Sequence, residues 1–303
     1  MFISRFPVRL IACMFCLVLL SWATTGCSPM EDPPETGLAE GAPSPEPVRI
    51  SYVEWVCSTA STHIAQAALE EALDIPMEVL PVTTLAMWES VAAGDIDAMV
   101  SAWLPSLHSG YYETNRHLVE DLGPNMEDVS IGLAVPDYVP LDSIHAVKDH
   151  ADEFGGRIIG IDPGAGIMHK TGMALKAYEM SGFNLISGSD ATLTTTLGNA
   201  INQEEWIVVT AWTPHWKFAR WNLKYLKDPL GVFGEGDNIH TIVRQGLSDE
   251  RPDVHAFFDR FSLELGQLEE VMLWIEESGM SPGAAGRRWV EENRDVVKKW
   301  AGR

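Results

Sequence analysis

Tryptophan occurs twice in the same local setting, in segments that lie 109 positions apart. The first segment, SAWLPSLH at 101–108, contains Trp103, and the second, TAWTPHW at 210–216, contains Trp212. A third tryptophan, Trp55, ends the apolar segment VRISYVEW. An indole ring attracts a cation by about 0.5–1 kcal/mol at exposed sites and by roughly 2 kcal/mol when desolvated. Three such rings around one cavity would suit a methylated ammonium group, which has no N–H to donate to a carboxylate.

The alternative is that these three rings are simply large core residues. Their repeated setting, and their positions at the ends of predicted strands, favour a binding site instead. We expect structural roles for the remaining tryptophans, which are Trp22, Trp88, Trp206, Trp216, Trp221, Trp274, Trp289 and Trp300.

The loop IDPGAGIMH at 161–169 follows a predicted strand and precedes a predicted helix. Gly164 and Gly166 would let the backbone approach a ligand, and the start of a helix offers unpaired N–H groups with a positive dipole end. The loop has neither a P-loop nor a GxGxxG pattern, so a carboxylate fits better than a phosphate. The alternative is a tight turn that needs glycine. The corresponding loop VCSTAS at 56–61 has no glycine, and we interpret it as ordinary helix capping.

His108 follows Trp103 closely enough to reach the same cavity and to donate a hydrogen bond to a carboxylate. A structural histidine is the alternative interpretation. A cation cage and an anion cradle in one cavity together predict a zwitterion, namely a small quaternary ammonium carboxylate.

The elements that must position these residues alternate between strand and helix and occur as two similar βαβαβ units. The first unit has strands at 48–55, 77–82 and 96–103 with helices at 58–73 and 83–94; the second has strands at 157–162, 183–188 and 206–212 with helices at 166–182 and 191–201. This alternation predicts parallel sheets covered on both faces, with ligands bound beyond the carboxyl ends of the strands.

Two β-rich segments, 129–139 and 238–246, are predicted to cross between the two units as a hinge. The residues from about 252 onward are predicted to form helices that return to the first unit. We therefore predict an α/β clamshell with the ligand in the interlobe cleft. Its first lobe is expected to comprise 48–134 plus 240–303, and its second lobe 135–239.

The N-terminal residues predict export. Residues 1–26 have the pattern of a lipoprotein signal peptide, a basic start followed by a short apolar run and small residues, and Cys27 is the expected lipidation site. Residues 27–47 are rich in proline and acids and predict a disordered tether. The formal net charge of −22 argues against nucleic acid as a partner. Once Cys27 carries lipid, Cys57 is left without a disulfide partner in the mature chain.

Five segments resemble signatures of the substrate-binding proteins of glycine betaine ABC transporters, specifically the OpuA type. They are SYVEW, GDIDAMVSAWLPSLH, IIGIDPGAGIM, VVTAWTPHWKFARWNLKYLKDP and IHTIVRQG, and the resemblance covers about 50–300. It implies a periplasmic-binding-protein-like clamshell of type II-like topology. It also implies contacts with the trimethylammonium group by Trp55, Trp103 and Trp212, and with the carboxylate by the backbone amides of Gly166 and Ile167 and by His108. Ser106-Leu107 departs from the Asn-Thr that the family often has there, which leaves ligand preference open.

The resemblance implies a protein that captures glycine betaine, with proline betaine as a second ligand, and delivers it to permease and ATPase subunits on separate chains. It implies no catalytic residue, cofactor or metal, and a location outside the cytoplasm on a lipid anchor, on the periplasmic side or the outer surface. The alternatives are another ligand (dimethylsulfoniopropionate or choline), a sensor ectodomain, and an enzyme that uses Cys57 and His63.

Overall fold

The computed structural model describes residues 46–234 and 236–303, which belong to one compact unit, Pro45–Arg303. The predicted signal peptide, the lipidation site Cys27 and all but the last two residues of the predicted tether lie outside the described residues. Within the described ranges, no helix is both long enough and apolar enough to cross a membrane.

The first lobe is built on a sheet in which β1 lies between β2 and β3, and both pairings are parallel. Every residue of β3 is buried, as expected for a strand covered on both faces. These elements confirm the first predicted βαβαβ unit. In chain order they are β1 (Val48–Tyr52), α1 (Val56–Leu73), β2 (Met77–Pro81), α2 (Thr84–Ala93) and β3 (Ala98–Leu104), followed by α3 (Ser109–Asn115).

The second lobe repeats this arrangement, because β5 lies between β6 and β7 and again pairs with both in parallel. Its elements confirm the second predicted unit and add short helices and a strand that were not predicted. They are α4 (Ile144–Val147), the 3-10 helix η1 (Lys148–His150), β5 (Arg157–Ile159), α5 (Gly166–Ala177), β6 (Asn184–Ile186), α6 (Asp190–Asn202), β7 (Val208–Thr213), α7 (Lys217–Arg220) and β8 (Leu223–Tyr225).

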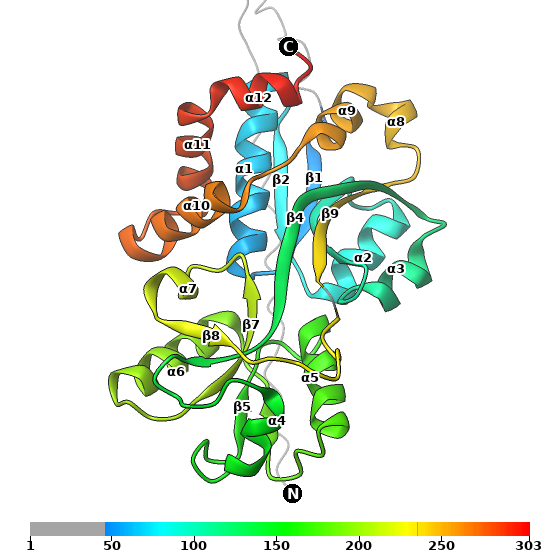
Figure 1. Ribbon diagram of the computed structural model, residues 1–303. Helices are drawn as coiled ribbons and strands as arrows, with labels where there is room; N and C mark the ends of the chain where they lie inside the picture. Colours follow the sequence, from blue (N-terminus) through cyan, green and yellow to red (C-terminus); the bar gives the residue numbers. More distant parts are fainter. Residues whose placement is uncertain (1–45, 235) are drawn as a thin grey trace, which may run out of the picture. The chain divides into compact units, whose positions relative to one another are not determined.

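One long strand, β4 (Val119–Pro136), belongs to both sheets (Figure 1). Its first part pairs antiparallel with β9 (Asp237–Arg244), and its last residues pair antiparallel with β7 and β8. β9 also pairs antiparallel with β3, so the strand order is β2-β1-β3-β9-β4-β7-β5-β6. The parallel pairing predicted from the alternation is confirmed within each βαβαβ unit, and the crossing strands β4 and β9 add antiparallel pairs that were not predicted.

The start of α1 also differs from the prediction. The expected Ser/Thr cap at residue 58 lies inside the helix, which begins at Val56 with Trp55 at the N-cap and without a side-chain cap from its own loop. By contrast, Thr83 caps α2 and Ser189 caps α6 through their side chains. The first N–H of α1 is bound from the second lobe instead, so sequence near the helix could not reveal its partner.

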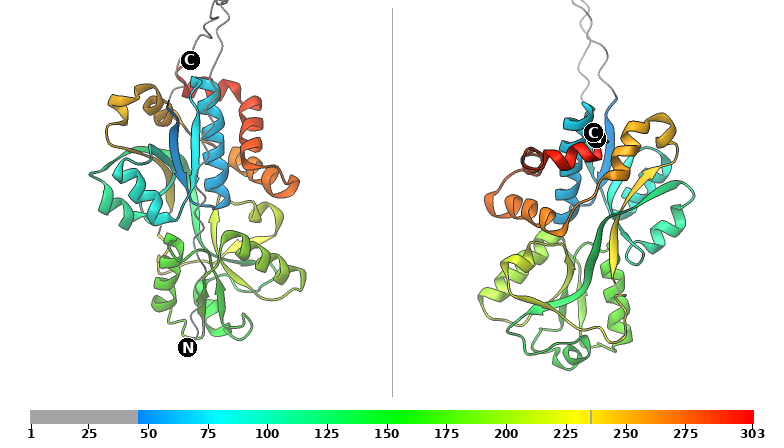
Figure 2. Two further views of the ribbon diagram at one scale, coloured as in Figure 1. Left: turned by 180° about the vertical axis from the view of Figure 1, so that it is seen from behind. Right: turned by 45° about the horizontal axis from the view of Figure 1, so that its top comes forward.

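The C-terminal helices return to the first lobe, as predicted. In both Figure 1 and Figure 2, α10, α11 and α12 lie beside α1, and α10 and α11 contact it. Gly286 of α11 lies so close to the His63 backbone that a side chain there would overlap it. These elements are α8 (Leu247–Glu250), α9 (Pro252–Arg260), α10 (Leu265–Ser278), α11 (Pro282–Glu292) and α12 (Arg294–Trp300).

Candidate binding pocket

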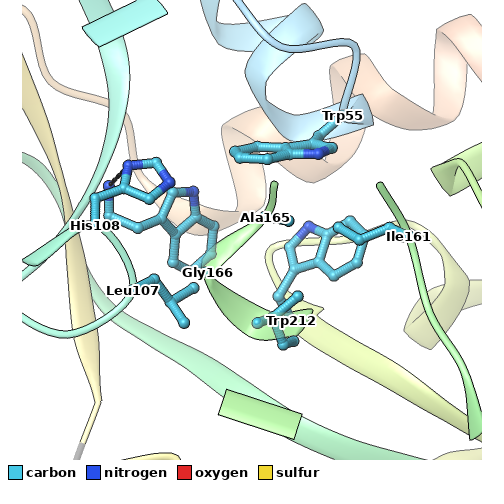
Figure 3. Close-up of a pocket in the computed structure, with 9 residues that line it drawn as sticks. Trp55, Leu107, His108, Ile161, Ala165, Gly166 and Trp212 are labelled. Carbon is cyan, nitrogen blue, oxygen red and sulfur yellow. Dashed lines mark hydrogen bonds between the residues drawn. The ribbon is translucent and has the colours of Figure 1, made fainter. Parts of the chain in front are cut away.

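A pocket lies where the carboxyl ends of β3 and β7 meet the start of α1 and α5 (Figure 3). All six residues predicted to contact a ligand line it, together with three for which no ligand contact was predicted. The nine lining residues are Trp55, Trp103, Leu107, His108, Ile161, Ala165, Gly166, Ile167 and Trp212.

The three tryptophans come from both lobes: Trp55 caps α1, Trp103 lies near the end of β3, and Trp212 lies near the end of β7. Their exposed fractions are only 6%, 2% and 4%, so the rings are desolvated. Since none of the nine lining residues is a carboxylate, a cation in this pocket would face π surfaces rather than an acid.

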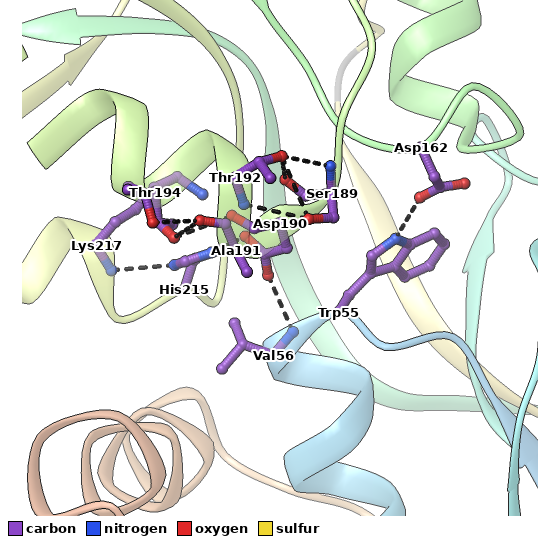
Figure 4. A network of polar contacts seen from close by, with 11 residues as sticks. Trp55, Val56, Asp162, Ser189, Asp190, Ala191, Thr192, Thr194, His215 and Lys217 are labelled. Atoms are coloured by element: carbon purple, nitrogen blue, oxygen red, sulfur yellow. Dashed lines mark hydrogen bonds and ion pairs between the residues drawn. The ribbon is translucent and has the colours of Figure 1, made fainter. Parts of the chain in front are cut away.

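The two lobes contact each other at the base of Trp55. The Trp55 indole Nε1–H donates to Asp162 Oδ2 at 2.9 Å, and the Val56 backbone N–H donates to Asp190 Oδ2 at 3.1 Å. Both carboxylates belong to the second lobe, so they hold the first turn of α1 and fix the plane of the Trp55 ring (Figure 4). Neither acid was predicted. The position of Asp162 in the glycine-containing loop was the one available hint.

The start of α5 supplies hydrogen-bond donors to the pocket. The N–H of Ala165 donates to Asp162 O and that of Met168 to Ala165 O, whereas Gly166 and Ile167 have no backbone or side-chain acceptor among the described residues. Both line the pocket. Two unpaired N–H groups at the positive end of a helix form a site that favours an anion.

Gly166 is also a point of contact between the lobes. A Cβ atom at this position would overlap the carbonyl carbon, carbonyl oxygen and Cβ of Leu107 in the first lobe. The Leu107 backbone is held in turn by Asp237, whose carboxylate accepts the N–H groups of Ser106 at 2.8 Å and Leu107 at 2.9 Å. Tyr111 bridges the same gap through its hydroxyl, which donates to Gly164 O at 3.0 Å.

His108 is a neutral hydrogen-bond donor in this setting. Its Nδ1 accepts the Trp88 indole N–H at 3.3 Å and the Trp103 backbone N–H at 3.1 Å, so the ring proton resides on Nε2. Burial lowers the pKa of the His108 imidazole to about 3. The histidine is therefore uncharged at neutral pH, with Nε2–H available to donate. Trp88, which we expected to be purely structural, selects this tautomer.

A buried polar cluster lies next to Trp212. It comprises Asp190, His215 and Lys217 (Figure 4), together with the Cys57 thiol. The His215 ring centroid is 4.8 Å from that of Trp212, and its Nε2 bonds Asp190 Oδ1 at 2.9 Å. Burial raises the pKa of the Cys57 thiol to about 12 and Asp190 adds to the shift, so the thiolate that a nucleophile requires is absent near neutrality.

The other member of the proposed enzyme pair lies elsewhere, because His63 bonds Gln66 at 3.0 Å and packs against Tyr52. Among the described residues, no group of three or more His, Cys, Asp or Glu side chains is placed to hold a metal ion. The two side chains considered as an enzyme pair, Cys57 and His63, therefore have different partners in this structure.

Comparison with known proteins places this pocket in context. Residues 46–292 match the family model described as the substrate binding domain of ABC-type glycine betaine transport systems. Among curated proteins, the chain is 42% identical over 157 residues to the glycine betaine/carnitine transport binding protein GbuC of Listeria monocytogenes. That match covers 51% of this chain and 52% of GbuC, so the chain spans about half the length of this relative.

Two solved structures are similar over most of the chain. The closed, liganded lactococcal OpuAC in complex with glycine betaine has a TM-score of 0.80 and 35% identity, covering 84% of this chain and 98% of that one. An ABC-transporter choline-binding protein in complex with choline has a TM-score of 0.79 and 27% identity, covering 84% and 91% respectively.

Proposed function

The chain belongs to the family of substrate-binding domains of ABC-type glycine betaine transport systems, and on this premise we propose that its own ligand is glycine betaine. In this proposal the trimethylammonium group lies between Trp55, Trp103 and Trp212. The carboxylate accepts hydrogen bonds from the N–H groups of Gly166 and Ile167 and from His108 Nε2. Members of this family serve transport and are not enzymes.

The observation that carries the proposal is the pairing of two recognition elements in one small pocket. Desolvated indole rings attract a cation, and the unpaired N–H groups at the start of α5 attract an anion. A zwitterion satisfies both, and it brings no net charge into a pocket that has no ionised lining residue. The carboxylate of Asp162 accepts a hydrogen bond from Trp55, and that of Asp190 accepts one from Val56. Both acids therefore support the pocket without lining it.

Family membership also fixes the broad setting. Substrate-binding proteins of ABC importers work outside the cytoplasm with permease and ATPase subunits. For this chain we propose lipid attachment at Cys27, a tether through residue 47, and separate permease and ATPase chains. We also propose the division into a first lobe of 48–134 plus 240–303 and a second lobe of 135–239, with closure around the ligand as the event that the permease recognises.

Choline is a second candidate, favoured by the similarity to the choline-binding structure. It would fill the tryptophan cage but leave Gly166, Ile167 and His108 without an anionic acceptor. Dimethylsulfoniopropionate, a sulfonium carboxylate, would satisfy both halves of the pocket and is the ligand most similar to glycine betaine in charge. Carnitine, which appears in the name of the Listeria relative, is a longer zwitterion and would need more room between the three tryptophans and the start of α5.

Calorimetric titration of the folded body with each of these ligands tests the proposal. We expect glycine betaine to bind with a micromolar or lower Kd and choline to bind far more weakly. Equal affinity for choline would remove the role assigned to the start of α5. Binding of another zwitterion, with none of glycine betaine, would keep the pocket and overturn the named ligand.

A further inference from the structure

Lys217 is fully buried, and its Nζ has no hydrogen-bond partner among the described residues. The ammonium nitrogen lies 3.9 Å from the centroid of the Trp212 ring and 5.6 Å from that of Phe218. A lysine is almost never fully buried without a partner, since removing its charge from water is costly. The Trp212 ring is therefore a direct neighbour of this ammonium group, and Lys217 is not among the residues that line the pocket.

The groups around Lys217 leave it without a closer acceptor. Asp190 faces it from α6, but Oδ1 bonds His215 and Oδ2 bonds Val56. His215 Nδ1 accepts a hydrogen bond from the backbone N–H of Lys217 at 3.0 Å. The ring proton of His215 therefore lies on Nε2, which donates a hydrogen bond to Asp190. The Cys57 thiol faces the cluster from α1. The lysine thus interacts with Asp190 through charge alone (Figure 4).

We propose that Lys217 sets the affinity of the pocket for quaternary ammonium ligands, because its ammonium group and the ligand share the Trp212 ring. This inference rests on the proposed function. A cation already bound over the ring draws on the same π electron density that a ligand cation would use, and two nearby like charges repel. A charged Lys217 also cancels the field of Asp190, which would otherwise attract a cation toward the pocket. Both effects make binding weaker when Lys217 is charged.

The charge on Lys217 can change near neutral pH. Burial lowers the pKa of its ammonium group to about 7, and Asp190 limits this shift. The neighbouring groups do not titrate in this range: burial lowers the pKa of His215 to about 4 and raises that of Cys57 to about 12. Burial disfavours the Asp190 carboxylate, but His215 and Lys217 outweigh burial and hold its pKa below the usual value. Lys217 is thus the member of this cluster that responds to pH near 7.

Linkage then predicts two measurable effects. Ligand affinity rises as pH increases through about 7, because the uncharged lysine is the form that binds better. By reciprocity the ligand lowers the pKa of Lys217, so binding near pH 7 releases part of a proton. His108 cannot be the source of this proton, because its pKa of about 3 leaves it already neutral.

The experiment is calorimetric titration of the wild-type body with glycine betaine between pH 6 and 8.5, repeated at pH 7 in phosphate and in Tris. These buffers differ in ionisation enthalpy, so the difference in heat reports the protons released. We expect Kd to fall roughly three- to tenfold across this range, which corresponds to a modest change in Coulomb energy, with proton release at pH 7.

The matched variants are Lys217→Met and Lys176→Met, the second on the exposed surface of α5. Lys217→Met removes the ammonium charge, while Asp190 keeps its hydrogen bonds to His215 and to the backbone N–H of Val56. Lys217→Met should bind about as tightly at pH 6 as the wild type does at pH 8.5, with no proton release, and Lys176→Met should behave as the wild type.

A wild-type protein that binds glycine betaine with one Kd at all pH values and without proton release would overturn the inference, even if Lys217→Met fails to fold. A Lys217→Met protein that keeps the wild-type pH profile would do the same. Failure of the wild type to bind any quaternary ammonium ligand at any pH is a different result, because it would overturn the proposed function itself.

Discussion

Replacing Gly166 by alanine should separate ligand binding from folding. The added Cβ would overlap backbone atoms of Leu107, which cannot rotate away because Asp237 holds the N–H groups of Ser106 and Leu107. The two lobes would then be unable to approach as they do in this structure. Overpacking of this kind costs about 1–3 kcal/mol, which predicts a roughly 5- to 150-fold weaker Kd for glycine betaine.

The same substitution elsewhere in α5 provides a matched control. An added Cβ at Gly172 has nothing within 4 Å, and alanine is favoured over glycine inside a helix by about 1 kcal/mol. Gly172→Ala should therefore bind as the wild type does and melt at the same temperature or higher. Gly166→Ala, by contrast, should lose affinity while each lobe keeps its fold.

Calorimetry measures the Kd of each variant, and thermal unfolding without ligand measures its stability. Together they show whether Gly166→Ala affects ligand binding or folding. Wild-type affinity in Gly166→Ala would refute the contact between Gly166 and Leu107 as a requirement for closure. A loss of unliganded stability as large as the loss of binding energy would also refute it, because the contact would then support the fold rather than closure.

Three further predictions address the tryptophan cage and the buried histidines. Trp103→Leu keeps an apolar side chain but removes the ring, so glycine betaine binding should weaken by about 1–3 kcal/mol in calorimetry; unchanged affinity would mark the ring as core alone. Trp88→Phe removes the indole N–H that donates to Nδ1 of His108 and so keeps the ring proton on Nε2, where it faces the ligand carboxylate. Glycine betaine should therefore bind about two- to tenfold more weakly, while the affinity for choline, which has no carboxylate, stays the same. Equal losses for both ligands would point to a packing defect. The free energy of unfolding should fall as pH drops from about 6.5 toward 4, because His108 and His215 take up protons in the unfolded chain but stay neutral in the folded protein, where their pKa values are about 3 and 4. Urea unfolding at pH 7 and pH 5 should show a loss of up to ~1.4 kcal/mol per pH unit for each histidine. A free energy of unfolding that does not change between these pH values would contradict the burial of both histidines as neutral groups.

The features that could be predicted from the sequence are those that follow from short-range sequence patterns. The alternation of strands and helices predicted both βαβαβ units. The repeated Trp-x-Pro setting predicted that Trp103 and Trp212 lie in one pocket. The same reasoning placed Trp55 in a strand, whereas β1 ends at Tyr52 and Trp55 is the N-cap residue just before α1. The error is small because the chain still leaves the sheet at its carboxyl end, where ligands bind.

The missed features all depend on how side chains pack in three dimensions, which the local sequence pattern does not show. Lys217 has the sequence character of a surface lysine, and its burial follows from packing beside Trp212 and Asp190. The tautomer of His108 depends on Trp88, which comes from α2 in a different part of the chain. The nearly complete burial of Trp103 and Trp212 also follows from the tertiary structure, and truncation of either ring to alanine would leave a cavity.

The central claim is that the pocket recognises the positive charge of its ligand as well as its shape. The compound 3,3-dimethylbutanoate has the shape and carboxylate of glycine betaine, with carbon in place of the charged nitrogen. If each of three rings contributes ~1 kcal/mol of cation attraction, this analogue should bind at least about 100-fold more weakly than glycine betaine in parallel calorimetric titrations. Affinities within threefold of each other would contradict cation recognition by the three tryptophans. The pocket would then recognise only the shape and the carboxylate of its ligand.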